Sequence, residues 1–384
     1  MQSDGTSGDL GGEYIFGEIA EQPGIVARLR AGPAPAWPDG GGRVVLAGAG
    51  DSLCAAELVA GLYGGIEAPQ PMAATAAADS LGTADALIGI SVSGRTPRVL
   101  EACRRARAGG AHTVAVTDDP GGPLARAASE VWCIHASPAG RLQSTDYECP
   151  QARQYVGYHH DVAQTKTFLA GVMTLARARE GAAGATDWAR LERTLETLVA
   201  PSFFEPLQSQ ARACADAGEA FFLAGAGTLP LARFAAYKLF EFDRAAHFAD
   251  IEEYCHTQYF VTRPGAAVVC LLDDADSARR AEEISDVLAE LFHARPLLMC
   301  SADVATPWAE PGRRIEVPVG GSPLERQVAL TVAIEWLTYL WGRIGAPNVN
   351  SFHGGFDTER LVAGTMRTIR GSRVVVDGTT LEEA

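Results

Sequence analysis

The stretch "RVVLAGAG", residues 43–50, ends in five residues that return in "AFFLAGAG", residues 220–227. In both places a short apolar run meets small residues, and a helical pattern follows. A strand that passes through a glycine-rich turn into a helix is the repeating unit of a parallel α/β sheet. The internal repeat therefore predicts two similar α/β domains in tandem.

Other short apolar runs extend this pattern in both halves of the chain. Further strands are expected at residues 86–91, 112–117, 131–134, 266–272 and 295–300. Helices are expected between them, near 52–64, 96–109, 229–244 and 277–293, and a helical stretch at about 162–217 would join the two halves. Alternation of buried strands with longer helices predicts parallel sheets covered by helices.

Composition narrows the class of protein. The chain has 384 residues, 47% of them hydrophobic, and its 32 basic and 47 acidic residues give a formal charge of -15. Such a charge, without a basic run, argues against a nucleic-acid partner. No stretch reaches the roughly 18 apolar residues of a membrane span, and a signal peptide is not apparent, so we expect no membrane partner and a cytoplasmic location.

Cysteines and lysines are used unevenly. The eight cysteines are scattered singly with no C-x-x-C pair, so we expect reduced, packed thiols. Only two of the 32 basic residues are lysines, Lys166 and Lys238. A compact ammonium at these two positions, or simple chance, would explain the choice.

The segment "ISVSGRTPRVLEA", residues 90–102, places hydroxyl groups between a strand and a helix. The free amides of a helix N-terminus point above the carboxyl edge of the sheet and attract anions. Ser91, Ser93 and Thr96 add hydroxyl donors there, while Gly94 allows a close backbone approach. Ordinary helix capping is the alternative explanation for these residues.

The first LAGAG turn adds Ser52 at an equivalent place, so two neighbouring strand ends can share one anion, most plausibly a phosphate. The second LAGAG turn has no such hydroxyl cluster. Its following strand ends in Asp273 and Asp274, which would repel an anion. One phosphate site is therefore expected, in the first domain.

The second domain offers acid–base groups instead. Lys238 and Glu241 are three residues apart and share a helix face, as a surface ion pair or as a base with its partner in a cleft. His256 is a candidate proton carrier, although a lone histidine is more often structural. No cysteine or carboxylate spacing completes a site around "YHHD", residues 158–161, so we expect neither metal nor cofactor.

Together these motifs resemble the sugar isomerase (SIS) domain family. "SVSGRTPRVLEA" after "LAGAGDSLCAAELVAGLYG" is similar to its phosphosugar-binding loops, and the tandem arrangement resembles the isomerase half of glutamine-dependent glucosamine-6-phosphate synthase. "GEIAEQPGIVARL" (17–29), "DVAQTKTF" (161–168) and "YKLFE" (237–241) look like further segments of that half. The resemblance implies two three-layer, flavodoxin-like α/β sandwiches with parallel sheets.

Site roles follow from the resemblance. It implies that Ser52, Ser91, Ser93 and Thr96 hold the sugar phosphate. Glu241 would move a proton between C1 and C2, with Lys238 beside it. It also implies that His256 opens the sugar ring from the neighbouring subunit of a homodimer.

Departures from the family pattern concern the substrate. The glutaminase half is not found, and no lysine follows Lys238, so isomerisation or deamination is favoured over amidotransfer. Arg95, inside the phosphate loop, is a further candidate for binding the anion, as is Lys166 within its own family segment. An insertion at residues 141–160 would reshape the sugar pocket.

The sequence therefore predicts a metal-free enzyme that interconverts aldose and ketose phosphates, or aminosugar phosphates. The alternatives are an aminosugar-phosphate deaminase, a fructosamine-phosphate deglycase, a partner of a separate glutaminase chain and a non-catalytic phosphosugar sensor. Four segments are expected: an N-terminal segment with a leading helix (1–42), the phosphate-binding SIS domain (43–185), the catalytic SIS domain (186–345) and a tail (346–384).

Overall fold

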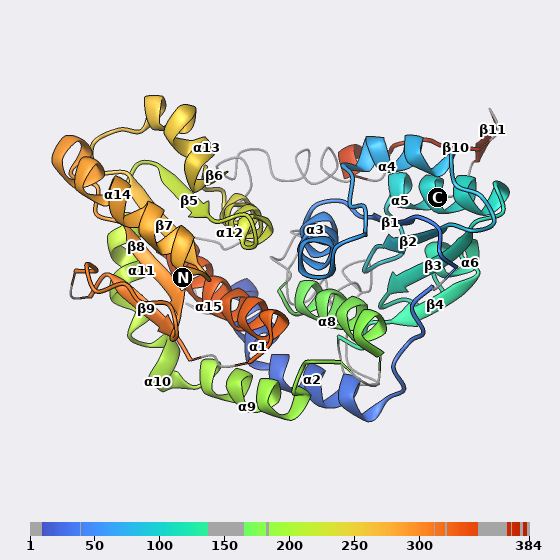
Figure 1. Ribbon diagram of the computed structural model, residues 1–384, viewed down its shortest axis with the longest axis horizontal. Helices are drawn as coiled ribbons and strands as arrows, with labels where there is room; N and C mark the ends of the chain where they lie inside the picture. The colour runs from blue at the N-terminus through green and yellow to red at the C-terminus, as the bar shows by residue number, and fades with distance from the viewer. Residues whose placement is uncertain are drawn as a thin grey trace, which may run out of the picture.

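The computed structural model describes residues 10–38, 40–136, 165–181, 184–310, 312–318, 321–344, 367–369, 371–376 and 379–381. Two parallel sheets lie at opposite ends of the molecule, with helices between them (Figure 1). The predicted insertion at 141–160 and the "YHHD" segment lie outside these residues. None of the described helices is long and apolar enough to cross a membrane.

The first sheet has four parallel strands in the order β1-β2-β3-β4. Its strands are β1 (Val44–Ala47), β2 (Ala86–Ile90), β3 (His112–Thr117) and β4 (Glu130–Cys133). One face packs on α4 (Pro71–Ala78), α5 (Pro97–Ala108) and α6 (Pro123–Ala127), and the other faces α3 (Asp51–Tyr63) and α8 (Lys166–Glu180). Because helices cover both faces, the strands are apolar throughout, as the sequence predicted.

The second sheet has five parallel strands in the order β6-β5-β7-β8-β9. They are β5 (Ala220–Ala224), β6 (His247–Asp250), β7 (Ala267–Leu272), β8 (Leu297–Ser301) and β9 (Arg314–Val317). Its outer face packs on α13 (Ile251–His256) and α14 (Ala275–Phe292). Its inner face packs on α11 (Leu207–Ala215), α12 (Leu229–Glu241) and α15 (Pro323–Arg343). The expected α/β architecture with three layers around each sheet is confirmed.

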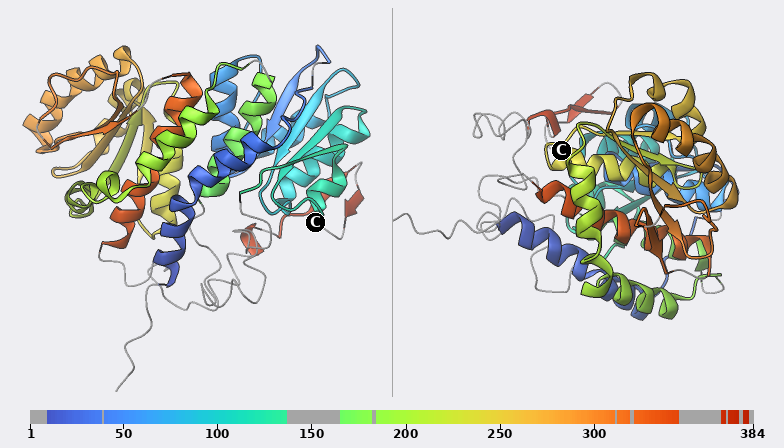
Figure 2. Two further views of the ribbon diagram at one scale, coloured as in Figure 1. Left: turned by 90° about the horizontal axis from the view of Figure 1, so that it is seen from below. Right: turned by 90° about the vertical axis from the view of Figure 1, so that its left-hand side faces the viewer.

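Helices from both halves meet in one central apolar core, which includes the inner faces of both sheets. Both LAGAG segments join a strand to a helix in this core, β1 to α3 and β5 to α12. Figure 2 shows these helices lying between the two sheets. The amino-terminal helices and α9 (Trp188–Leu198) run along one side, and the short α10 (Pro201–Phe204) follows.

The predicted leading helix is two helices, α1 (Leu10–Ala20) and α2 (Gln22–Ala31). Pro23 is the second residue of α2. Proline lacks an N–H and crowds the preceding turn, so it is tolerated at a helix start but interrupts a continuous helix. The break turns the chain from α1, which contacts α15 of the second half, to α2, which packs on α8 and α9.

The end of the chain returns to the first domain. Strands β10 (Val374–Val376) and β11 (Thr379–Leu381) form an antiparallel hairpin, and Val374 is buried in the core beneath α5. Arg105 of α5 donates a hydrogen bond to the carbonyl of Val375. The hairpin thereby brings residues 367–369 close to the carboxyl edge of the first sheet.

Candidate active site

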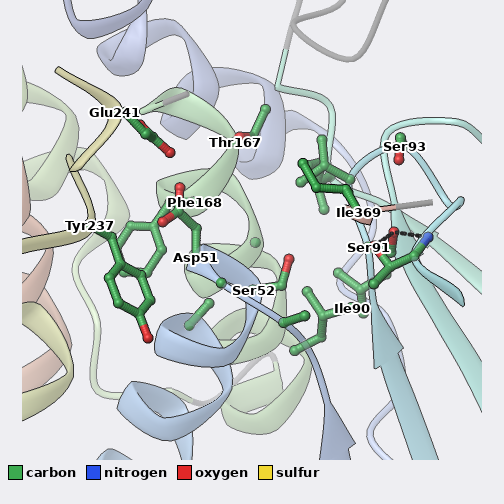
Figure 3. Close-up of a pocket in the computed structure, with 18 of the residues that line it drawn as sticks. Asp51, Ser52, Ile90, Ser91, Ser93, Thr167, Phe168, Tyr237, Glu241 and Ile369 are labelled. Atoms are coloured by element: carbon green, nitrogen blue, oxygen red, sulfur yellow. Dashed lines mark hydrogen bonds between the residues drawn. The ribbon is translucent and has the colours of Figure 1, made fainter. Parts of the chain in front are cut away.

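The candidate site is a pocket of about 410 Å³ between the carboxyl edge of the first sheet and the end of α12. Its lining includes Ser52, Ser91, Ser93 and Thr96 from the first domain and Glu241 from the second. Figure 3 shows Glu241 and Ser91 on opposite sides of the pocket. The structure thus brings together five residues that the sequence marked for phosphate binding and for proton transfer.

Two glycine turns shape the anion end. Gly50, just before α3, has a φ of 57°, and Gly94, in the loop after β2, has a φ of 65°. Gly48 lies so close to Ser52 that a Cβ would come within 2.5 Å of the Ser52 backbone. Only glycine fits such a close approach, and the turns hold the first residues of α3 against the pocket.

The hydroxyl loop is held by its own hydrogen bonds. The Ser91 and Thr96 hydroxyl oxygens are 2.9 Å apart, and the Gly94 amide donates to the Ser91 carbonyl. Ser91 and Ser93 are 2% and 6% exposed. Among the residues of the described chain that line the pocket, none is basic. Hydroxyls and helix amides are therefore the donors available to an anion here.

At the other end of the pocket Glu241 forms an ion pair with Lys238 at 2.7 Å. The Lys238 side chain is 1% exposed, so the pair is not the surface ion pair that the sequence left open. Lys238 does not line the pocket; its ammonium also lies 2.7 Å from Asp51 Oδ2 and 5.0 Å from the centre of the Phe234 ring. Burial alone would lower the pKa of Lys238, but Asp51 and Glu241 outweigh it and raise that pKa.

Lys166 and Arg95 lie behind the pocket lining. Lys166 is 4% exposed and pairs with Glu21 at 3.0 Å and Glu18 at 3.9 Å, while its neighbour Thr167 lines the pocket. Arg95 pairs with Asp119 at 3.2 Å and donates to the Ser93 carbonyl. In these positions both residues support the walls of the site, and direct contact with a ligand stays a prediction.

His256 lies away from the pocket of its own chain. It ends α13, its side chain is 70% exposed, and its ring nitrogen is 3.0 Å from Glu252. It is not among the pocket-lining residues. The predicted role in a neighbouring subunit therefore stays a prediction, and within the described residues no cluster of three His, Cys, Asp or Glu is placed to hold a metal.

Sequence reasoning missed several residues at the site. Asp51 was noted only as a helix opener, yet it lines the pocket and binds Lys238. Ile369 reaches the pocket from the chain's end. Glu335 on α15 is fully buried and accepts from Gln22, and burial raises its pKa to about 8. An acid amid the apolar residues of α15 was the signal for Glu335; nothing marked Ile369.

Residues 41–147 match the SIS domain family. Two curated relatives carry the name N-acetylmuramic acid 6-phosphate etherase. The protein from Rubrobacter xylanophilus is 29% identical over 37% of this chain and 46% of its own length. That from Jannaschia sp. is 40% identical over 22% of this chain and 35% of its own. This chain thus spans under half the length of either relative.

Solved structures match over most of the chain at low identity. The C-terminal domain of glucosamine-fructose-6-phosphate aminotransferase from Francisella tularensis is 16% identical, with a TM-score of 0.64 over 91% of this chain and all of that one. Tagatose-6-phosphate ketose/aldose isomerase from Escherichia coli has the same identity and TM-score over 91% and 97%. Glucosamine-6-phosphate deaminase from Thermotoga maritima is 14% identical, with a TM-score of 0.59 over 90% and 97%. Residues 41–147 are therefore a SIS domain, and the whole chain has the fold of these proteins, as its sequence predicted.

Proposed function

We propose that this protein is a sugar-phosphate enzyme in which Glu241 removes a proton from the carbon next to the substrate's carbonyl group. The observation that carries the proposal is the shared pocket: the Ser/Thr cradle lies at one end and Glu241 at the other. A substrate anchored by its phosphate would present its opposite, reacting end to the carboxylate. Such fixed placement is itself a large part of catalysis.

The proton transfer is balanced without a cofactor. Glu241 takes the C2 proton of an open-chain aldose phosphate, and the C–H electrons form a C1–C2 double bond as the carbonyl oxygen gains a proton. The enediol then passes its C2 hydroxyl proton to solvent or an acid, and C1 receives a proton from Glu241, which yields the ketose. A 2-amino sugar follows the same course through an enolamine, and loss of ammonia from its product would make the enzyme a deaminase.

Ring opening requires a further acid–base group. We assign it to His256 of a second subunit, because His256 is largely exposed and absent from its own chain's pocket lining. The proposal therefore includes a homodimer with shared sites. Its imidazole would exchange a proton with the ring oxygen and the anomeric hydroxyl near neutral pH.

A second candidate function follows from the names of the two sequence relatives. An etherase acting on N-acetylmuramic acid 6-phosphate must break an ether bond, and removal of the C2 proton would permit elimination of the group at C3. This reaction shares its first step with isomerisation, so Glu241 and the cradle would serve either. The fate of the enediol, rather than the base, distinguishes the two.

Proton exchange tests both candidates. Fructose 6-phosphate, glucosamine 6-phosphate and N-acetylmuramic acid 6-phosphate are each incubated with the protein in D₂O and followed by NMR. We expect deuterium at C1 or C2 of at least one compound, with the product identifying an isomerase, deaminase or etherase. Binding without exchange would contradict an enzyme and favour a phosphosugar sensor.

A further inference from the structure

Asp51 is an acidic residue at a place where an anion is expected. It is the first residue of α3, lines the pocket, and its side chain is 23% exposed. A carboxylate here repels a phosphate, so its presence has a cost for binding. Its Oδ2 accepts a hydrogen bond of 2.7 Å from Lys238, the same ammonium that pairs with Glu241.

Lys238 is therefore shared by two carboxylates from different domains. Its ammonium is buried and lies 2.7 Å from an oxygen of each. If it paired with Glu241 alone, its whole charge would favour the ionised form of Glu241 and make that carboxylate a weaker base. Asp51 takes part of this attraction and adds a negative charge near Glu241.

Other charged groups surround the pair from every neighbouring helix. Glu335 of α15 and Asp51 of α3 both interact electrostatically with Lys238. Glu18 of α1 acts on Glu335 and pairs with Lys166 of α8, which also binds Glu21. A separate pair joins α3 to α12 at 2.7 Å, between Glu57 and Arg233. Of these acidic groups, Asp51 alone binds Lys238 from the pocket wall.

We propose that Asp51 is a positioning residue that keeps Glu241 strongly basic by sharing Lys238 with it. This inference rests on the proposed role of Glu241. Asp51 also fixes the ammonium between the two domains, so that Glu241 is held at the pocket rather than drawn toward Lys238. Asp51 itself takes no proton from the substrate.

A substrate-free titration tests the inference. Protein labelled with [¹³C]carboxyl glutamate is titrated by NMR, and the Glu241 signal is assigned by its loss in Glu241→Gln. We expect Asp51→Asn to lower the pKa of Glu241 by about one unit, because removal of a nearby like charge favours ionisation. Glu57→Gln also removes an α3–α12 ion pair but leaves Lys238 untouched, so the Glu241 pKa should stay at its wild-type value.

The conservative variant Asp51→Glu keeps the charge and should restore the wild-type pKa. Asp51→Ser, which can still cap α3, replaces the asparagine variant if that does not fold. An unchanged Glu241 pKa in the Asn or Ser variant would overturn the inference, whether or not the protein turns over a sugar phosphate. Failure of the wild type to exchange any substrate proton would instead overturn the proposed function.

Discussion

Lys238 Nζ lies 2.7 Å from both Asp51 Oδ2 and Glu241 Oε2, so one buried ammonium joins a carboxylate of the first domain to one of the second. The helices that carry them, α3 and α12, also meet through the Glu57–Arg233 pair. The site is thus assembled at the contact between domains. Its chemistry and the stability of that contact depend on the same residues.

Replacing Lys238 with methionine should destabilise the protein by about 3–5 kcal/mol, because two carboxylates then face each other in a buried place without a cation. Urea unfolding measures the loss. Arg233→Met is the matched control: its pair with Glu57 also joins α3 to α12, but is partly exposed and should cost about 1 kcal/mol. Equal losses in the two variants would contradict a special role for Lys238.

Glu335 should make stability depend on pH. Burial raises its pKa from 4.5 to about 8, so the fold favours its protonated form. That contribution is complete below about pH 4.5 and is lost as the pH rises to 8, at a slope of up to about 1.4 kcal/mol per pH unit. Urea unfolding from pH 5 to 8 should show this slope in the wild type and a weaker one in Glu335→Gln. Parallel slopes would show that Glu335 is already ionised.

Ser91→Ala should weaken binding of a sugar phosphate about tenfold, since one hydrogen bond to a charged group is lost. Isothermal titration calorimetry with fructose 6-phosphate, or whichever compound shows exchange, measures the affinity. Thr113→Val is the control, because Thr113 is also a buried hydroxyl of this domain, bonded to Ser129, but it does not line the pocket. Unchanged affinity in Ser91→Ala would place the phosphate elsewhere.

A shared active site predicts that two inactive variants restore each other. Glu241→Gln and His256→Asn should each be nearly inactive alone. Randomly mixed subunits should recover about a quarter of the activity, because half of the dimers are mixed and each mixed dimer rebuilds one of its two sites. Activity that stays absent after subunit exchange would contradict the assignment of His256 to the neighbouring subunit.

The fold was predictable from the sequence because its central strands carry strong local signals. Their apolar runs and the two glycine turns mark β1, β2, β3, β5 and β7. The edge strands β6 and β9 were not predicted: each has four residues, and polar side chains alternate with apolar ones where one face meets solvent. Short edge strands depend on their neighbours more than on their own composition.

The site was predictable only in part. Hydroxyls beside a glycine turn identify an anion cradle locally, so Ser52, Ser91, Ser93 and Thr96 were found. The sharing of Lys238 was not foreseen, because Asp51 precedes it by 187 positions and only the tertiary fold brings them together. Arg95 shows the converse limit: its charge suggested a ligand, whereas in the fold it binds Asp119.

The most direct test of the central claim compares wild type with Glu241→Gln in D₂O, using the sugar phosphate that exchanges in the screen. We predict that the wild type incorporates deuterium next to the carbonyl carbon. The variant should lose this exchange while its affinity for the same compound, measured by calorimetry, changes less than about threefold, because the cradle that anchors the phosphate is intact. Exchange at the wild-type rate in Glu241→Gln would contradict the claim that Glu241 is the base.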